Sequence, residues 1–208
     1  MIKNLILDMG GVILGVDYSK VFTGFKALGV DNLEHFFTQQ TQIPLVDKFE
    51  VGEISSEEFR EGVREITQKN LSDKDIDFAW NSMVLLPRKE DILFIQEEKT
   101  KYKGVYLFSN TNAIHLKYVK DLFLKTMGFD VFKELFTKVY FSNEIHERKP
   151  NLSSFNYVID DAKLNKEETL FIDDTPQNVL GAEKAGIHSA LLPAGKTLRD
   201  LKQEGILL

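Results

Sequence analysis

The chain has 208 residues, of which 43% are hydrophobic and 28% are charged, and this composition is typical of a folded globular protein. The net charge of −6 argues against a nucleic-acid partner, because such proteins usually present a basic face. No cysteine is present, which excludes disulfides and thiolate metal sites. We find no leader peptide and no apolar run of membrane-spanning length, so we expect a cytoplasmic protein without a membrane partner. The sequence does not indicate an oligomeric state.

The first predicted element is a buried strand at residues 5–7 that ends at a carboxylate. Its apolar run is followed directly by Asp8-Met9-Gly10-Gly11. Burying Asp8 costs free energy unless a cation pairs with it, and glycines allow backbone N–H groups to surround an anion. The same pattern also occurs in ordinary turns. Taken alone, it therefore indicates either a turn or a nucleophile that faces a phosphate.

Residues 16–87 show helical patterns and no convincing strand. An apolar helical face at residues 21–28 ends before Gly29, a plausible C-cap. Ser55 and Glu58 have the spacing of a capping box, and Ser72 is placed to cap a further helix. We therefore predict an all-helical insert at 16–87. Its core should contain four aromatic residues, namely Phe36, Phe37, Phe49 and Trp80.

Four more apolar runs, separated by helical patterns, complete the predicted core. They lie at residues 105–108, 139–141, 170–172 and 190–192, and they are nearly continuous in hydrophobicity. Such runs are typical of a parallel sheet that is covered on both faces. We predict a Rossmann-like α/β core formed by residues 1–15 and 88–208. Ligands of such sheets bind at the carboxyl ends of the strands, so the polar residues there should converge.

Two of these polar segments have the chemistry of a phosphate site. Ser109 and Asn110 follow the second strand and can donate hydrogen bonds to phosphate oxygens, although such residues also cap helices. Lys149 can neutralise a phosphate, and the adjacent Arg148 is the alternative. A lysine in isolation is more often on the surface.

The segment after the fourth strand has the chemistry of a metal site. Asp173 and Asp174 repel each other unless a cation lies between them, and hard oxygen ligands favour Mg²⁺. The same segment also resembles a helix N-terminus with proline in its first turn. His115 and His146 show no metal-ligand spacing, and we expect both on the surface.

Taken in chain order, these segments match the four motifs of the haloacid dehalogenase-like hydrolase superfamily. The matching residues are Asp8-x-Gly-Gly, Ser109-Asn110, Lys149-Pro150 and Asp173-Asp174-x-x-x-Asn178. The insert resembles the small helical cap of that superfamily. The first motif, together with Phe49-Glu50-x-Gly52-x-Ile54-Ser55, resembles the bacterial α-D-glucose-1-phosphate phosphatases. This resemblance implies a Mg²⁺-dependent phosphatase of a small phosphorylated metabolite, such as a sugar 1-phosphate.

The resemblance also implies roles for individual residues. Three side chains would act in catalysis: Asp8 as the nucleophile that forms an aspartyl-phosphate, Ser109 as a phosphoryl ligand, and Lys149 as a bridge between nucleophile and phosphate. Asn110 would help to bind the phosphate, and Asn178 would orient the metal site. Mg²⁺ would be held by Asp8, Asp173, Asp174 and the backbone carbonyl of Gly10.

Gly10 departs from the pattern of most phosphatases in the superfamily, in which an aspartate at this position protonates the leaving oxygen. General acid–base catalysis contributes roughly 10²- to 10⁴-fold in rate. Either the leaving group is good enough without it, as an anomeric hydroxyl is, or another residue supplies the proton, with Asp17 and Glu50 as candidates. Two alternative functions stay open: a metal-independent haloacid dehalogenase, and a catalytically weak binding or regulatory module on the same fold.

Overall fold

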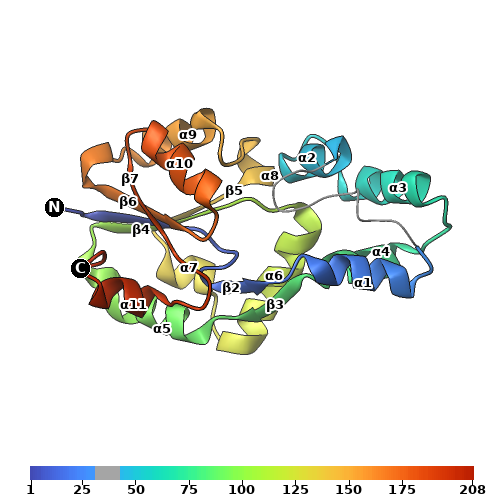
Figure 1. The fold of residues 1–208 in the computed structure, drawn as a ribbon, viewed down its shortest axis with the longest axis horizontal. Coiled ribbons are helices and arrows are strands. Elements are labelled where there is room, and N and C mark those ends of the chain that lie inside the picture. The colour runs from blue at the N-terminus through green and yellow to red at the C-terminus, as the bar shows by residue number, and fades with distance from the viewer. Residues whose placement is uncertain (31–42) are drawn as a thin grey trace.

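The computed structural model describes residues 1–30 and 43–208, so the predicted core residues Phe36 and Phe37 lie outside the described part. The core is a five-stranded parallel sheet in the order β5-β4-β1-β6-β7 (Figure 1). Its strands are β1 (Asn4–Leu7), β4 (Gly104–Ser109), β5 (Lys138–Phe141), β6 (Thr169–Asp173) and β7 (His188–Leu191). The predicted parallel sheet is confirmed, with the last strand beginning and ending earlier than the apolar run at 190–192.

Alternating side chains of the strands form two apolar layers. Leu5 and Leu7 of β1 point to one face and Ile6 points to the other, as the two-residue period of a strand requires. One face is covered by α5 (Lys89–Glu98), α6 (Ala113–Met127), α7 (Val131–Leu135) and α11 (Leu198–Gln203). The other is covered by α9 (Leu152–Ala162) and α10 (Pro176–Lys184). The predicted Rossmann-like core with helices on both faces is therefore confirmed.

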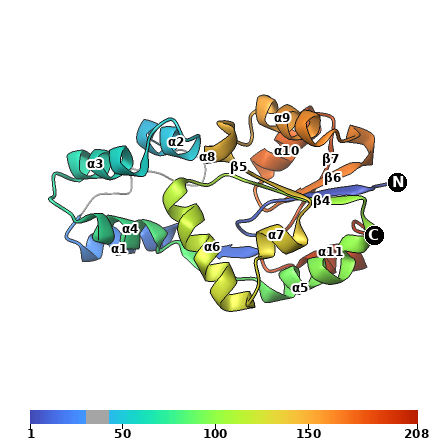
Figure 2. The ribbon, with the colours of Figure 1, turned by 180° about the vertical axis from the view of Figure 1, so that it is seen from behind.

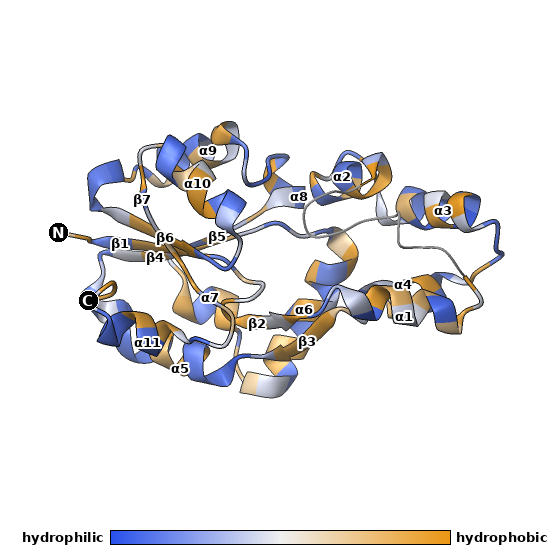
Figure 3. Cartoon of the chain, viewed as in Figure 1, coloured by the Kyte–Doolittle hydropathy of each residue, from blue (hydrophilic) through white to orange (hydrophobic). Residues whose placement is uncertain are grey.

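Short elements complete the core. A one-turn helix, α8 (Ser142–Ile145), follows β5 directly, and two 3-10 turns, η2 (Lys99–Lys101) and η3 (Lys166–Glu168), precede β4 and β6. Figure 3 shows hydrophobic residues concentrated in the sheet and hydrophilic residues on the outer faces of its helices. None of the helices in the described ranges is both long and apolar enough to cross a membrane.

The insert contributes α1 (Ser19–Ala27), α2 (Pro44–Glu50), α3 (Ser56–Thr67) and α4 (Asp73–Asn81). These helices bury an apolar cluster of their own, which includes Phe49 and Trp80 as predicted. The predicted capping box at the start of α3 is confirmed: Ser55 Oγ accepts from the Glu58 N–H, and the Glu58 side chain accepts from the Ser55 N–H. Ser72 caps α4 through its Oγ alone, which accepts from the Asp75 N–H.

The prediction that residues 16–87 contain no strand is wrong at both ends of that range. Strands β2 (Leu14–Val16) and β3 (Val84–Pro87) form a two-stranded antiparallel ribbon. Both strands are short and only partly buried, and their pairing partners are about 70 residues apart in the sequence. Local periodicity therefore does not reveal them. This ribbon connects the insert to the core.

The molecule is elongated, with the sheet at one end and α1–α4 at the other (Figures 1 and 2). Both termini lie at the sheet end, away from the insert. Figure 2 shows that α6 extends from the core toward α4, and Ile114 of α6 joins the apolar cluster of the insert.

Candidate active site

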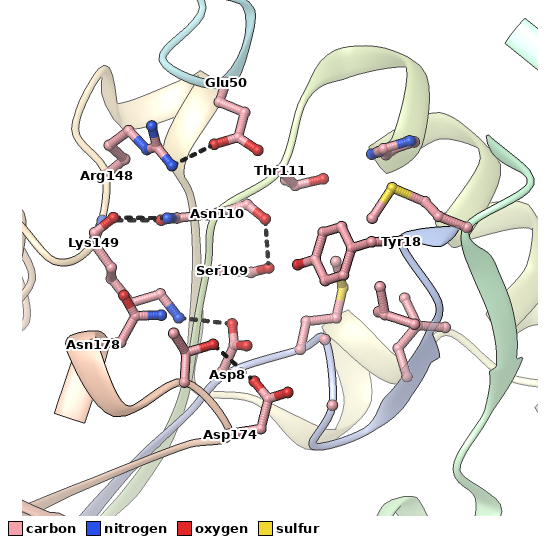
Figure 4. Close-up of a pocket in the computed structure, with 18 of the residues that line it drawn as sticks. Asp8, Tyr18, Glu50, Ser109, Asn110, Thr111, Arg148, Lys149, Asp174 and Asn178 are labelled. Carbon is pink, nitrogen blue, oxygen red and sulfur yellow. Dashed lines mark hydrogen bonds and ion pairs between the residues drawn. The ribbon is translucent and has the colours of Figure 1, made fainter. Parts of the chain in front are cut away.

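A cavity of about 590 Å³ opens at the carboxyl ends of the strands, between the sheet and the insert (Figure 4). The sheet side contributes residues from the ends of different strands or the loops after them, among them Asp8, Ser109, Lys149 and Asp174. The insert side contributes Tyr18, Val46, Asp47, Glu50, Trp80 and Met83. The parallel sheet thus brings together polar residues that are more than 160 positions apart in the sequence.

Lys149 joins two of the predicted site carboxylates. Its Nζ lies 2.7 Å from Asp8 Oδ1 and 2.6 Å from Asp173 Oδ2, and only 1% of its side chain is exposed. Burial alone would lower the pKa of Lys149, but the negative charges of Asp173 and Asp8 raise it. The lysine therefore stays protonated. The neighbouring Arg148 is directed toward the insert instead, where it pairs with Asp47 and Glu50.

Negative charge exceeds positive charge around Asp8. Burial, opposed by Lys149 and reinforced by the charges of Asp173 and Asp174, raises the pKa of Asp8 to about 7. Burial and the charge of Asp173 also raise the pKa of Asp174. A single ammonium group does not balance the three carboxylates, so the cluster favours a further cation.

Within the described ranges, Asp8, Asp173 and Asp174 form a candidate metal centre. One oxygen from each lies within 4.8 Å of the others, and all three are hard donors suited to Mg²⁺. The site therefore fits the ion. Gly10 also lines the cavity. Its carbonyl remains a predicted ligand of the ion.

The two neighbouring aspartates differ in their surroundings. Asp173 is completely buried and accepts from Lys149 Nζ, from the Thr175 N–H at 2.8 Å, and from Asn178 Nδ2 at 3.0 and 3.2 Å. These bonds use both of its oxygens, so Asp173 is placed to hold Lys149 and Asn178 in position. Asp174 instead lines the cavity.

The glycine loop after β1 comes close to Asp174. Gly11 has φ +69°, and a Cβ there would lie 2.1 Å from Asp174 Oδ2. Gly10 lies outside the left-handed region, and a Cβ there would meet Val16 Cγ2 at 3.2 Å. Arg88 at the start of α5 donates to the Gly11 carbonyl and so fixes the loop. Gly11 is therefore the glycine that the local geometry requires.

Ser109 and Asn110 lie at the end of β4, but their side chains are placed differently. Ser109 is buried at the cavity, with its Oγ 3.3 Å from the Asn110 carbonyl. The Asn110 amide bonds to the backbone of Lys149: its Nδ2 donates to the carbonyl at 2.8 Å, and its Oδ1 accepts from the N–H at 2.9 Å. The Asn110 side chain therefore positions Lys149. The predicted contact of Asn110 with phosphate would then be made by its backbone N–H.

The expectation that His115 lies on the surface is wrong. Its ring is buried between α6 and α4 and stacks on Trp80, with ring centroids 5.1 Å apart. Nε2 lies 3.0 Å from the Trp80 carbonyl and Nδ1 lies 3.0 Å from Asn112 Nδ2, so Nε2 donates and Nδ1 accepts. Burial lowers the pKa of His115 to about 4. His146 is exposed, as expected.

The two predicted proton-donor candidates differ as well. Asp17 does not line the cavity; its Oδ1 accepts from the N–H and hydroxyl of Ser19, and these bonds lower the pKa of Asp17. Glu50 does line the cavity, where its carboxylate lies 3.0 Å from Arg148 Nη2. No sequence motif points to Tyr18, which precedes α1 and whose hydroxyl points into the cavity (Figure 4).

Comparisons with known proteins agree with this geometry. A family profile described as haloacid dehalogenase-like hydrolase matches residues 87–192, about half of the chain. A D-ribitol-5-phosphate phosphatase from Bacteroides thetaiotaomicron is 28% identical over 192 residues, which cover 91% of each protein.

Two solved structures are also similar over nearly their whole length. One is a HAD (haloacid dehalogenase) family enzyme from Bacteroides thetaiotaomicron in complex with magnesium and inorganic phosphate; it is 36% identical with a TM-score of 0.92, over 97% of this chain and 99% of that one. The other, a predicted HAD-like family hydrolase from Porphyromonas gingivalis, is 30% identical with a TM-score of 0.84, over 98% of both chains. Together with the profile match, these similarities show that the chain belongs to the haloacid dehalogenase-like hydrolase family.

Proposed function

We propose that this protein is a Mg²⁺-dependent phosphatase that hydrolyses a small sugar or polyol phosphate, such as a sugar 1-phosphate, through an aspartyl-phosphate on Asp8. One observation carries the proposal: Lys149 Nζ binds Asp8 and Asp173 at 2.7 and 2.6 Å, beside Asp174 and at the base of a cavity. The crystal complex of a relative with magnesium and inorganic phosphate supports it.

In this proposal, the buried Asp8 carboxylate attacks the phosphoryl group, and Lys149 holds that carboxylate in place while offsetting negative charge. Ser109 and the backbone N–H of Asn110 donate to the phosphoryl oxygens. Asp8, Asp174 and the Gly10 carbonyl would hold Mg²⁺, with Asp173 as a further ligand or as the residue that positions Lys149. When bound, Mg²⁺ neutralises charge on the phosphoryl oxygens.

The size and charge of the cavity support a small, uncharged leaving group. A volume of about 590 Å³ suits a small metabolite. Arg148, a cation on the insert side of the cavity, is already paired with Asp47 and Glu50, which disfavours a second phosphate or carboxylate on the substrate. The relative named for D-ribitol-5-phosphate is consistent with a polyol or sugar phosphate.

We further propose that residues 16–87 act as a cap domain on a core formed by residues 1–15 and 88–208. The side chains of Tyr18, Glu50 and Trp80 line the cavity from the insert, so the insert is placed to exclude water and to contact the leaving group. The ribbon of β2 and β3 would then be the connection about which the cap moves.

Phosphate release from a panel of metabolites, measured with Mg²⁺ and with excess chelator, tests the proposal. We expect release from sugar or polyol phosphates that stops when the metal is chelated. Full activity in chelator, or halide release from a haloacid, would favour a dehalogenase. No turnover of any substrate, despite metabolite binding, would favour a binding module.

A further inference from the structure

We propose that Tyr18 is a catalytic residue whose hydroxyl protonates the leaving oxygen, so that the protein can cleave esters of poor leaving groups although Gly10 carries no side chain. The inference rests on the proposed phosphatase function. It adds a residue that no sequence motif identifies.

The position of Tyr18 carries the argument. It lies just after β2 and lines the cavity from the insert side, across from the Asp8 and Lys149 pair. Figure 4 shows its hydroxyl directed across the cavity toward Ser109 and Asp8. A nucleophile and a leaving group occupy opposite sides of the phosphoryl group during an in-line displacement. A donor that faces Asp8 across the cavity is therefore on the side where the leaving oxygen must lie.

The electrostatic surroundings of Tyr18 agree with this position. Burial raises the pKa of its phenol above the usual value, and the charges of Glu50, Asp8 and Asp174 raise it further. The hydroxyl is therefore close enough to the carboxylates to respond to their charge, and it keeps its proton at neutral pH. A protonated group is what a general acid requires in the first step.

Several other polar side chains in the described cavity lining are less suited to donate this proton. The carboxylates of Asp47 and Glu50 are paired with Arg148, so they are placed to accept hydrogen bonds from its guanidinium. His115 uses both ring nitrogens inside the protein, one to donate to Trp80 and one to accept from Asn112. The hydroxyls of Ser109 and Thr111 are aliphatic and release a proton less readily than a phenol does.

The proton balance of the two steps is complete. In the first step a bond forms between an Asp8 carboxylate oxygen and phosphorus, the bond from phosphorus to the leaving oxygen breaks, and the Tyr18 proton passes to that oxygen. In the second step water attacks phosphorus, its proton returns to the Tyr18 phenolate, and the bond to Asp8 breaks. Inorganic phosphate and the alcohol leave, and both side chains return to their first state.

The test compares two kinds of leaving group in the Tyr18→Phe variant. A terminal phosphate ester of a sugar or polyol needs protonation of its leaving oxygen, whereas acetyl phosphate does not. We expect Tyr18→Phe to lose about 10²-fold or more in kcat/KM on the terminal ester, within the range of general acid catalysis, and to change little in kcat/KM on acetyl phosphate. The ratio kcat/KM is used because it excludes hydrolysis of the aspartyl-phosphate, which both substrates share. Its preference should shift toward the 1-phosphate of the same sugar. Tyr157→Phe is the matched control, because Tyr157 lies on α9 outside the cavity lining, and it should behave as the wild type.

Equal losses in kcat/KM on both substrates, or no loss on either, would overturn the inference while leaving the proposed function intact. A wild-type protein that releases phosphate from neither substrate would refute the proposed function and the inference with it. A series of esters on the wild-type protein covers the case in which Tyr18→Phe does not fold. A shallow dependence of rate on the acidity of the leaving alcohol supports a proton donor, and a steep one contradicts it.

Discussion

Replacing Gly11 with alanine should damage the metal centre more than the fold. A Cβ at Gly11 would lie 2.1 Å from Asp174 Oδ2, well inside van der Waals contact, so the carboxylate must move by an ångström or more. The left-handed φ of +69° adds roughly 1–2 kcal/mol of backbone strain. Displacing a metal carboxylate should weaken Mg²⁺ binding by about 10- to 100-fold, by analogy with changes to groups that orient metal ligands.

Gly195→Ala is the matched control, because Gly195 has φ +83° and a Cβ there would have no atom within 4 Å. Both variants should lose a few degrees in Tm, roughly 2–4 °C for each kcal/mol of strain. Only Gly11→Ala should raise the Mg²⁺ concentration that gives half-maximal phosphate release, with a matching loss of affinity in calorimetric titration with Mg²⁺. An unchanged Mg²⁺ requirement in a folded Gly11→Ala protein would refute the placement of Asp174 in the metal centre.

Three further predictions concern the cap, the glycine loop and a buried histidine. Replacing residues 17–83 by a short loop should reduce turnover of sugar phosphates more than turnover of acetyl phosphate, and equal losses would make the insert only structural. Gly10→Asp should restore terminal-ester hydrolysis to a Tyr18→Phe protein. The new side chain can be accommodated, because its Cβ must displace Val16 Cγ2 by only a few tenths of an ångström and needs no left-handed φ. A double variant as slow as Tyr18→Phe would argue against a missing proton donor. Since the pKa of His115 is about 4 in the folded chain and about 6.5 when unfolded, the unfolded state binds more protons below pH 6.5. The contribution of His115 to stability should therefore fall by about 3 kcal/mol between pH 7 and pH 4, and denaturant titrations of His115→Gln should lack this part of the pH dependence.

The sheet could be predicted from the sequence because strands buried on both faces leave continuous apolar runs. The runs that contain Leu5, Leu107 and Ile172 are examples, and each lies in a strand of the parallel sheet. Strands β2 and β3 could not be predicted, because each is stabilised by a partner about 70 residues away and not by a local pattern. Helix starts such as Ser55 are local signals, and the capping box there was correctly predicted.

The residues of the candidate site likewise differ in whether the sequence alone could predict their placement. Asp8 and Asp174 are visible in the sequence, because a polar residue at a strand end has a fixed place in a parallel sheet. The position of the Asn110 amide on the Lys149 backbone and the burial of His115 against Trp80 depend on packing between distant segments. Tyr18 likewise reaches the cavity only because the ribbon of β2 and β3 directs the chain over it.

The most direct test of the central claim is to find the phosphorylated residue. The protein would be mixed with Mg²⁺ and phosphate-labelled substrate, quenched in acid during turnover, and digested for mass spectrometry. We expect the label on the peptide that contains Asp8, and we expect Asp8→Asn to form no labelled peptide and to release phosphate only at the background rate. A folded Asp8→Asn protein with near-native turnover, or label on another residue, would contradict the account.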